Sequence, residues 1–160
     1  MKIEYFHASK FGNGAMVAEE FRKVMAGKGT TVNVHHIRDA SPKEVPPADL
    51  YVFSSPGRIG KPIGGMRKFL KKLQIASGSR YALLTTEGKP MPNKKTGVVP
   101  TAEEFAKYQR VRPIMNALLQ AKGLKKVAED KVYVTGLKGP LEEGWQKKVE
   151  DFAAALIVSP

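Results

Sequence analysis

Residues 9–14 form a short polar stretch between a strand-like run and a helix-like run. The stretch reads Ser9-Lys10-Phe11-Gly12-Asn13-Gly14. A helix that begins directly after such a loop presents free backbone N–H groups at the positive end of its dipole, which together make an anion site. We therefore expect this loop to hold a phosphate. The alternative is that Gly12 and Gly14 only permit positive φ in a tight turn and that Ser9 caps that turn.

Two further loops follow strand-like runs and are also rich in small residues. They are Ser55-Pro56-Gly57-Arg58-Ile59-Gly60 and Thr85-Thr86-Glu87-Gly88. In an open parallel sheet, ligands bind beyond the carboxyl ends of the strands, where the winding of the sheet reverses. We therefore expect both loops to lie beside the loop at residues 9–14 and to line one ligand site with it.

The remaining reactive residue types predict no catalytic centre. The chain has no cysteine, which excludes disulfides, thiolate metal sites, iron–sulfur clusters and cysteine nucleophiles, so any redox chemistry belongs to a bound cofactor. His35 and His36 are adjacent on a strand and point to opposite faces, so one metal site does not readily take both. Ser54 and Ser55 lack the Gly-x-Ser-x-Gly elbow of hydrolases. We expect neither a metal site nor a catalytic side chain.

Hydrophobic periodicity indicates which elements position these loops. Five runs rich in β-branched and aromatic residues predict strands at residues 2–8, 30–37, 49–55, 80–86 and 131–135. Apolar residues at helical spacing predict helices around residues 17–25, 63–73, 108–118 and 141–156. Thr101 with Glu104 three residues later predicts a capping box before the third helix, and Pro113 predicts a kink or a split within it.

Strands that alternate with helices predict an α/β fold of three layers. The middle layer is a doubly wound, mainly parallel five-stranded sheet, and helices cover both of its faces. The apolar run from Leu50 to Phe53 fits a central strand that is buried on both sides. A length of 160 residues and a hydrophobic fraction of 42% suit one globular unit, so we expect residues 1–160 to form a single domain.

Three stretches of the chain resemble flavodoxins. Residues 9–14 are similar to the flavodoxin phosphate loop, Thr/Ser-x-Thr-Gly-x-Thr, at the same place after the first strand. Residues 49–73 resemble that family's third strand, its Ser-Pro loop beside the flavin and the following helix, and residues 131–156 resemble its fifth strand and last helix. The resemblance implies the strand order 2-1-3-4-5, bound FMN as cofactor, and one- or two-electron transfer.

The phosphate loop matches the family only in part. Ser9, Gly12 and Asn13 agree with the motif, but Phe11 and Gly14 stand where the family usually has Thr. Two hydroxyl donors to the phosphate are therefore missing. We expect backbone N–H groups to bind the phosphate instead, with help from Lys10.

The two other loops are expected to contact the flavin ring. The resemblance implies that Pro56 and Gly57 expose backbone groups along the ring, with Ile59 as its nearest apolar cover, and that residues 85–88 add backbone contacts. The third loop lacks the aromatic residue that often stacks on the ring in this family, and Met91 or Tyr108 is expected to take that place.

The charge of the chain predicts its partner. The formal net charge is +12, and six basic residues follow one another without an acid between them: Arg58, Lys61, Arg67, Lys68, Lys71 and Lys72. Such a surface implies an acidic partner, which for an electron carrier is an acidic redox protein. The alternatives are a merely solvated basic surface and, least favoured because no binding motif is present, nucleic acid.

Basic residues near the ring also predict how the flavin behaves. Typical flavodoxins surround the flavin with acids, which disfavour the anionic hydroquinone. Here Arg58, Lys61 and Lys89 belong to or border the ring loops, and opposite charge favours the charged form. We expect a less negative hydroquinone couple than in an acidic flavodoxin, unless these long side chains extend into water and are screened.

Three classes of function follow. The first is a small FMN-binding electron carrier. The second is an FMN-dependent NAD(P)H oxidoreductase that acts on quinones, with residues 89–108 as a lid over the substrate. The third is a flavin-free domain of this fold that uses its basic surface to bind a partner. The chain opens directly on a strand-like run and has no apolar stretch of about 18 residues, so we expect no membrane span and a cytoplasmic location.

Overall fold

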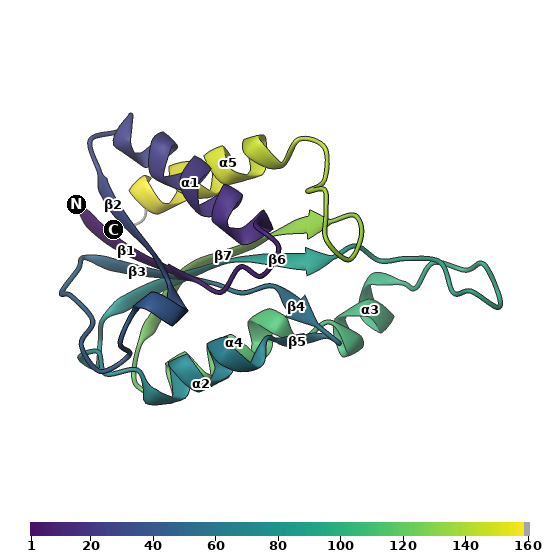
Figure 1. Cartoon of the computed structure of the whole chain (residues 1–160), viewed down its shortest axis with the longest axis horizontal. Coiled ribbons are helices and arrows are strands. Elements are labelled where there is room, and N and C mark those ends of the chain that lie inside the picture. The colour runs from purple at the N-terminus through teal and green to yellow at the C-terminus, as the bar shows by residue number, and fades with distance from the viewer. Residues whose placement is uncertain (159–160) are drawn as a thin grey trace.

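The computed structural model describes residues 1–158 and contains one central parallel sheet (Figure 1). Its strands are β1 (Lys2–His7), β2 (Thr31–His36), β3 (Leu50–Ser54), β6 (Arg80–Gly88) and β7 (Lys125–Val134). They are all parallel and lie in the order β2-β1-β3-β6-β7. With the sheet strands counted along the chain, this is the order 2-1-3-4-5, and the expected doubly wound α/β fold is confirmed.

Helices cover both faces of the sheet, which gives three layers (Figure 1). The helices α1 (Asn13–Ala26) and α5 (Trp145–Val158) lie on one face, and α2 (Gly64–Lys72) and α4 (Val111–Gln120) lie on the other. A short 3₁₀ helix, η1 (Ile37–Asp39), follows β2, and α3 (Ala102–Tyr108) lies beyond the carboxyl ends of the strands. Across residues 1–158 every helix is too short or too polar to cross a lipid bilayer.

Two apolar cores hold the layers together, because successive side chains of a strand point to opposite faces. Ile3 and Tyr5 of β1 pack with Phe21 and the other buried residues of α1 and α5, whereas Phe6 packs against the helices of the opposite face. Every residue of β3 is buried, as expected for a central strand. A fully buried side chain of this size contributes about 1.5–3 kcal/mol, so the two cores fix the positions of the strand ends.

Two strand and helix boundaries differ from those expected. The fifth sheet strand begins at Lys125 and not at residue 131, because its polar first half pairs with β6 along a sheet edge that is only half buried. Leu141 lies outside the last helix and forms a bridge with Val134. Gly144, with φ at 79°, ends the loop, and α5 then begins at Trp145.

The third predicted helix is split, as Pro113 suggested. α3 ends at Tyr108 and α4 begins at Val111, so Pro113 lies in the first turn of α4, where its missing N–H leaves no backbone bond unmade. The capping box of Thr101 and Glu104 at the start of α3 is confirmed. The junction between the two helices therefore lies at residues 109 and 110.

Candidate functional site

A cavity of about 370 Å³, the strand-end cleft, opens at the carboxyl ends of the strands. The expected site residues that line it are Ser9, Lys10, Phe11, Asn13, Gly14, Pro56, Gly57, Arg58, Thr86 and Gly88. The structure therefore brings the three predicted loops together at one place. The charged residues that line the cleft are Lys10 and Arg58, and both are cationic.

The first loop turns into α1 at Gly12, the residue that precedes the helix. Gly12 has a φ of 96°, a conformation that side-chain-bearing residues rarely adopt, and its N–H donates to Ser9 Oγ at 3.0 Å. A Cβ atom at Gly12 would meet no heavy atom within 4 Å, so the space beside it is open. The first turn of α1 carries no acidic residue, which leaves the positive end of the helix dipole available to an anion.

Two histidines hold Ser9 by its backbone. The Ser9 N–H donates to His7 Nδ1 at 3.2 Å, and the Ser9 carbonyl lies 2.8 Å from His36 Nε2. Because His36 Nδ1 accepts the Arg38 N–H at 3.1 Å, its Nε2 carries the proton and donates to Ser9. Burial, together with the smaller effects of the nearby His36 and Arg38, lowers the pKa of His7 to about 4. Neutral His7 is thus the acceptor that positions the loop.

The two departures from the phosphate-loop motif have structural reasons. A Cβ at Gly14 would lie 3.2 Å from Ser9 Cβ, so the loop closes on itself where a Thr would crowd it. The ring of Phe11 lies under two ammonium groups, Lys10 Nζ and Lys138 Nζ, each 5.6 Å from its centroid. Phe11 therefore gathers two cations at the mouth of the cleft in place of one hydroxyl group.

The second loop folds into a small antiparallel ribbon of β4 (Gly57–Arg58) and β5 (Lys61–Pro62). Ser55 is buried and does not line the cleft; its Oγ donates to the Pro56 carbonyl at 2.9 Å and accepts the Ile63 N–H at 3.2 Å. Ile59, at the tip of the ribbon, has a φ of 52° and is 78% exposed. Its side chain borders a neighbouring cavity and not the strand-end cleft.

Glu87 of the third loop is directed toward α4 and away from both cavities. Its carboxylate is 1% exposed, accepts the Arg112 Nε–H at 2.7 Å, and also accepts the Thr85 hydroxyl. Arg112 Nη1 donates in addition to Glu129 at 2.8 Å. Burial alone would lower the pKa of Arg112, but its bonds to both carboxylates outweigh burial and raise it. The side chain of Glu87 is thus an anchor for α4, and a ligand in the cleft can meet only its backbone.

Sequence reasoning missed the loop after β7. Val134, Gly136 and Leu137 line the strand-end cleft together with Ile63, and the side chain of Leu137 is 86% exposed. The Asn13 amide donates to the carbonyl of Lys138 at 3.2 Å and so ties this loop to the phosphate loop. A signal was present, since small residues follow this strand as they follow the others.

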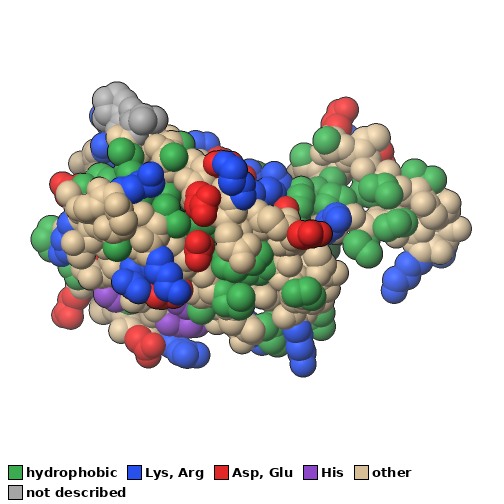
Figure 2. Space-filling view, turned by 90° about the horizontal axis from the view of Figure 1, so that it is seen from above, with side chains coloured by type: hydrophobic (Ala, Val, Ile, Leu, Met, Phe, Trp, Pro, Cys, Tyr) green, Lys and Arg blue, Asp and Glu red, His purple; other side chains and the backbone are tan. Residues whose placement is uncertain are grey.

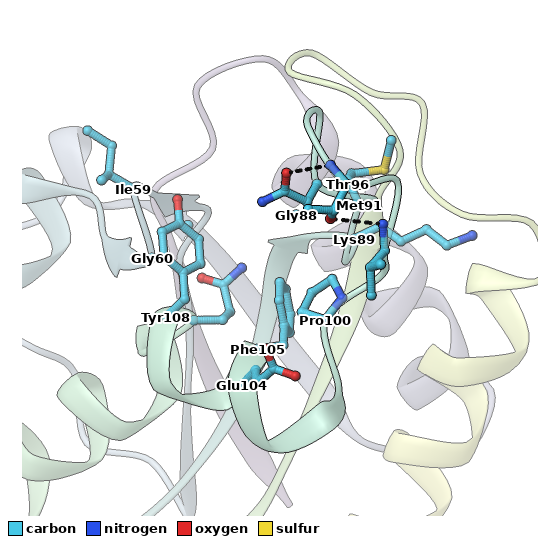
Figure 3. A pocket seen from close by; sticks show the side chains of 14 residues that line it. Ile59, Gly60, Gly88, Lys89, Met91, Thr96, Pro100, Glu104, Phe105 and Tyr108 are labelled. Carbon is cyan, nitrogen blue, oxygen red and sulfur yellow. Dashed lines mark hydrogen bonds between the residues drawn. The ribbon is translucent and has the colours of Figure 1, made fainter.

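A second and larger cavity of about 730 Å³, the arm cavity, adjoins the cleft. It shares Gly57 and Gly88 with the cleft and lies between the β4–β5 ribbon, α3 and residues 89–100, which we call the arm (Figure 3). Met91 and Tyr108, which were expected to cover the flavin ring, line this cavity and not the cleft. The arm stands out from the body of the molecule, and apolar side chains gather on it (Figure 2).

The arm and the ribbon are each held by backbone contacts. Asn93 closes a turn in the arm, because its Oδ1 accepts the N–H groups of Lys95 and Thr96 at 2.8 and 3.1 Å. The ribbon packs tightly on the α3–α4 junction: the Arg110 N–H donates to the Gly60 carbonyl at 2.6 Å, and a Cβ at Gly60 would meet the carbonyl oxygen of Tyr108 at 2.1 Å. Within residues 1–158, no three His, Asp or Glu side chains gather as a metal site.

No family model matches the sequence, and no curated protein matches it. Several solved structures do match the chain. Oxidised flavodoxin 2 from Bacillus cereus is 19% identical, with a TM-score of 0.74 over 98% of each chain. Oxidised flavodoxin 1 from the same organism is 18% identical, with a TM-score of 0.72 over 98% of this chain and 97% of its own. Rubredoxin oxygen:oxidoreductase from Desulfovibrio gigas is 13% identical, with a TM-score of 0.68 over 96% of this chain but 34% of its own. The fold is therefore flavodoxin-like.

Proposed function

We propose that the protein binds FMN in the strand-end cleft and transfers electrons to or from an acidic redox protein. The observation that carries the proposal is the loop at residues 9–14, which turns into α1 at the positive-φ Gly12 and lines the cleft with each of its other residues, although Gly12 itself does not line the cleft. Of the three structural neighbours named above, two are flavodoxins and the third is an oxidoreductase. Their fold covers nearly the whole chain, which supports a redox role.

The residues of the cleft fit FMN. Backbone N–H groups at the start of α1, with Lys10 and Lys138 near the Phe11 ring, would hold the phosphate, and among residues 1–158 no carboxylate lines the cleft to repel it. Pro56, Gly57 and Gly88 would lie along the ring. When bound, FMN supplies one- or two-electron chemistry, which the side chains of a cysteine-free chain do not offer.

Positive charge beside the flavin ring supports a shift in the reduction potential of the hydroquinone couple. Arg58 lines the cleft, so a negative charge on the reduced ring would have a cationic neighbour. We expect the hydroquinone couple to be less negative than that of an acidic flavodoxin. Potentiometry checks this expectation, and an equal or more negative couple would contradict it.

Flavin retention tests the proposal. The full chain is mixed with FMN, free flavin is removed by gel filtration, and the visible spectrum is recorded. We expect a flavin band near-stoichiometric with protein. A colourless protein would contradict the proposal and would favour a flavin-free domain that binds a partner through its basic surface. Electron transfer from the reduced protein to an acidic ferredoxin, which should slow as salt is added, then tests the partner.

A further inference from the structure

We propose that the arm cavity binds a small, uncharged, planar acceptor of the quinone class beside the flavin. The binding step depends on this chain alone, whereas the redox step rests on the proposed function. Under this proposal the protein is an oxidoreductase with two ligands, and the arm forms part of the second binding site. Four features support the proposal: the size of the arm cavity, the chemistry of its walls, its charges and its junction with the strand-end cleft.

The cavity has the size and the walls of a small-molecule site. Its volume of about 730 Å³ lies within the range of roughly 300–1,000 Å³ that is usual for such sites. Phe105, Tyr108 and Pro100 present rings on the α3 side (Figure 3), and Met91 also lines the cavity, from the arm. Flat aromatic faces favour a planar ring packed against them.

The charges of the cavity favour a neutral ligand. Glu104 is occupied by its own helix, because its Oε1 accepts the Thr101 N–H in the capping box. Lys89 is exposed, and its long side chain extends away from the cavity (Figure 3). Neither charge is therefore placed to pair with a bound group. A ligand with a full charge would lose hydration and gain no ion pair in return.

Gln109 supplies a polar contact at the junction of the two cavities. Its Oε1 is buried and has no hydrogen-bond partner among the described residues. A Cβ at Gly57 would lie 3.3 Å from this oxygen, which places it against the glycine that both cavities share. A buried acceptor of this kind gains from a ligand that brings a hydroxyl donor. The hydroxyl group of a quinol, the reduced form of a quinone, is such a donor.

The shared wall allows the two ligands to approach closely. Gly57 and Gly88 line both cavities, and neither carries a side chain that would separate a ring in one cavity from a ring in the other. In the redox step the quinone would gain two electrons and two protons, and its two C=O groups would become C–O–H groups. The anionic hydroquinone of FMN would supply the two electrons and one proton, and water would supply the second proton. No other oxidant or reductant is needed for this step.

Binding is measured first on the FMN-free full chain. The ¹⁵N-labelled protein is titrated with 1,4-naphthoquinone while its ¹H–¹⁵N spectrum is followed. The probe cannot add to thiols, because the chain has no cysteine. We expect shifts in the arm and around the α3–α4 junction. Absence of shifts there would overturn the proposal.

Matched variants locate the site. Met91→Ala and Tyr108→Ala should each raise the dissociation constant of naphthoquinone about fivefold, because each removes part of one wall. Met16→Ala is the control, since Met16 is exposed to a similar degree, 52% against 63% for Met91, but lies on α1 outside the cavity. Gln109→Leu should weaken binding of 1,4-dihydroxynaphthalene under anaerobic conditions and leave naphthoquinone binding unchanged. Equal effects of the Met91 and Met16 variants would contradict the assignment.

The redox step is tested separately on the FMN-loaded protein. Anaerobic protein reduced by dithionite is mixed with naphthoquinone, and the return of the flavin band is timed. Met91→Ala should slow this return several-fold relative to Met16→Ala. A protein that binds naphthoquinone but refuses FMN overturns the proposed function and the redox step while the site stands. A protein that binds FMN but not naphthoquinone overturns the site alone.

Discussion

The strand-end cleft and the arm cavity share two glycines but are built in different ways. The cleft is enclosed by loops that leave parallel strands at one edge of the sheet; two histidines hold the loop at residues 9–14, and Asn13 ties it to the loop after β7. The arm cavity lies under a long segment that is held by its own turn at Asn93 and by the bond from the Lys89 N–H to the Val134 carbonyl. A site made by strand ends is fixed by the topology of the sheet, whereas a site made by a long loop depends on contacts that the topology does not dictate.

The largest expected effect concerns the support that lies behind both cavities. Arg112→Ala leaves the buried carboxylate of Glu87 without its ion pair, next to the shared Gly88, and should lower the free energy of unfolding by about 4 kcal/mol. Arg38→Ala is the matched control, because its ion pair with Asp39 is exposed and should contribute about 0.5 kcal/mol or less. Urea unfolding measures both. Similar small losses of unfolding free energy in the two variants would show that the ion pair of Arg112 with the buried Glu87 contributes no more than an exposed ion pair.

The next effect separates the two cavities. Gly12→Val forces a β-branched residue into positive φ at the phosphate loop and should weaken FMN binding about a hundredfold, or about 2.7 kcal/mol. Gly29→Val is the control, since Gly29 has a φ of 76°, also has open space around it, and lies after α1 far along the chain from the cleft. Both variants should lose similar stability, but only Gly12→Val should lose FMN. Naphthoquinone binding should be unchanged in both.

A smaller effect follows from the buried histidine of the cleft. The pKa of His7 is about 4 in the folded protein and near 6.5 when unfolded, so the unfolded chain binds more protons between these values and stability falls as pH decreases through that window. From pH 7 to pH 5 the wild type should lose about 2 kcal/mol that His7→Gln does not lose. Urea unfolding at both pH values checks this. Parallel losses in the two proteins would mean that His7 is not the titrating group.

The smallest effect tests the independence of the arm. Asn93→Ala removes the side-chain acceptor for the Lys95 and Thr96 amides but touches neither core, so it should change the free energy of unfolding by about 0.5 kcal/mol or less. Amide hydrogen exchange at Lys95 and Thr96 should nevertheless quicken. A large loss of global stability would show that the arm is part of the core structure and would remove the distinction between the two cavities.

The sequence allowed the fold and most of the cleft to be predicted, for reasons visible in particular residues. Apolar runs define the strands, and a parallel sheet gathers the loops at residues 9–14, 55–60 and 85–88 at one edge. The direction of the Glu87 side chain was beyond such reasoning, because its partner Arg112 lies 25 residues further on, in a helix whose packing the sequence pattern does not specify. Leu137 was missed because the loop after the last strand was not expected to reach the cleft.

The loop at residues 9–14 shows the same limit of sequence-based prediction within a single loop. The sequence shows that Gly14 stands where Thr is usual, but only the structure places Ser9 where the extra atoms would go. Likewise, Lys138 is distant from Phe11 along the chain, and its position over that ring depends on the fold of the loop after β7. Local patterns can be read from the sequence, whereas contacts between separate loops require the structure.

Comparing FMN with riboflavin tests the central claim most directly, because the two ligands differ only in the phosphate. Isothermal titration of the full chain with each gives the contribution of the loop at residues 9–14. The account predicts that FMN binds about a hundredfold more tightly than riboflavin and that Gly12→Val largely removes the difference. Equal affinity for the two ligands, or an advantage for FMN that survives in Gly12→Val, would contradict the assignment of this loop as the phosphate site.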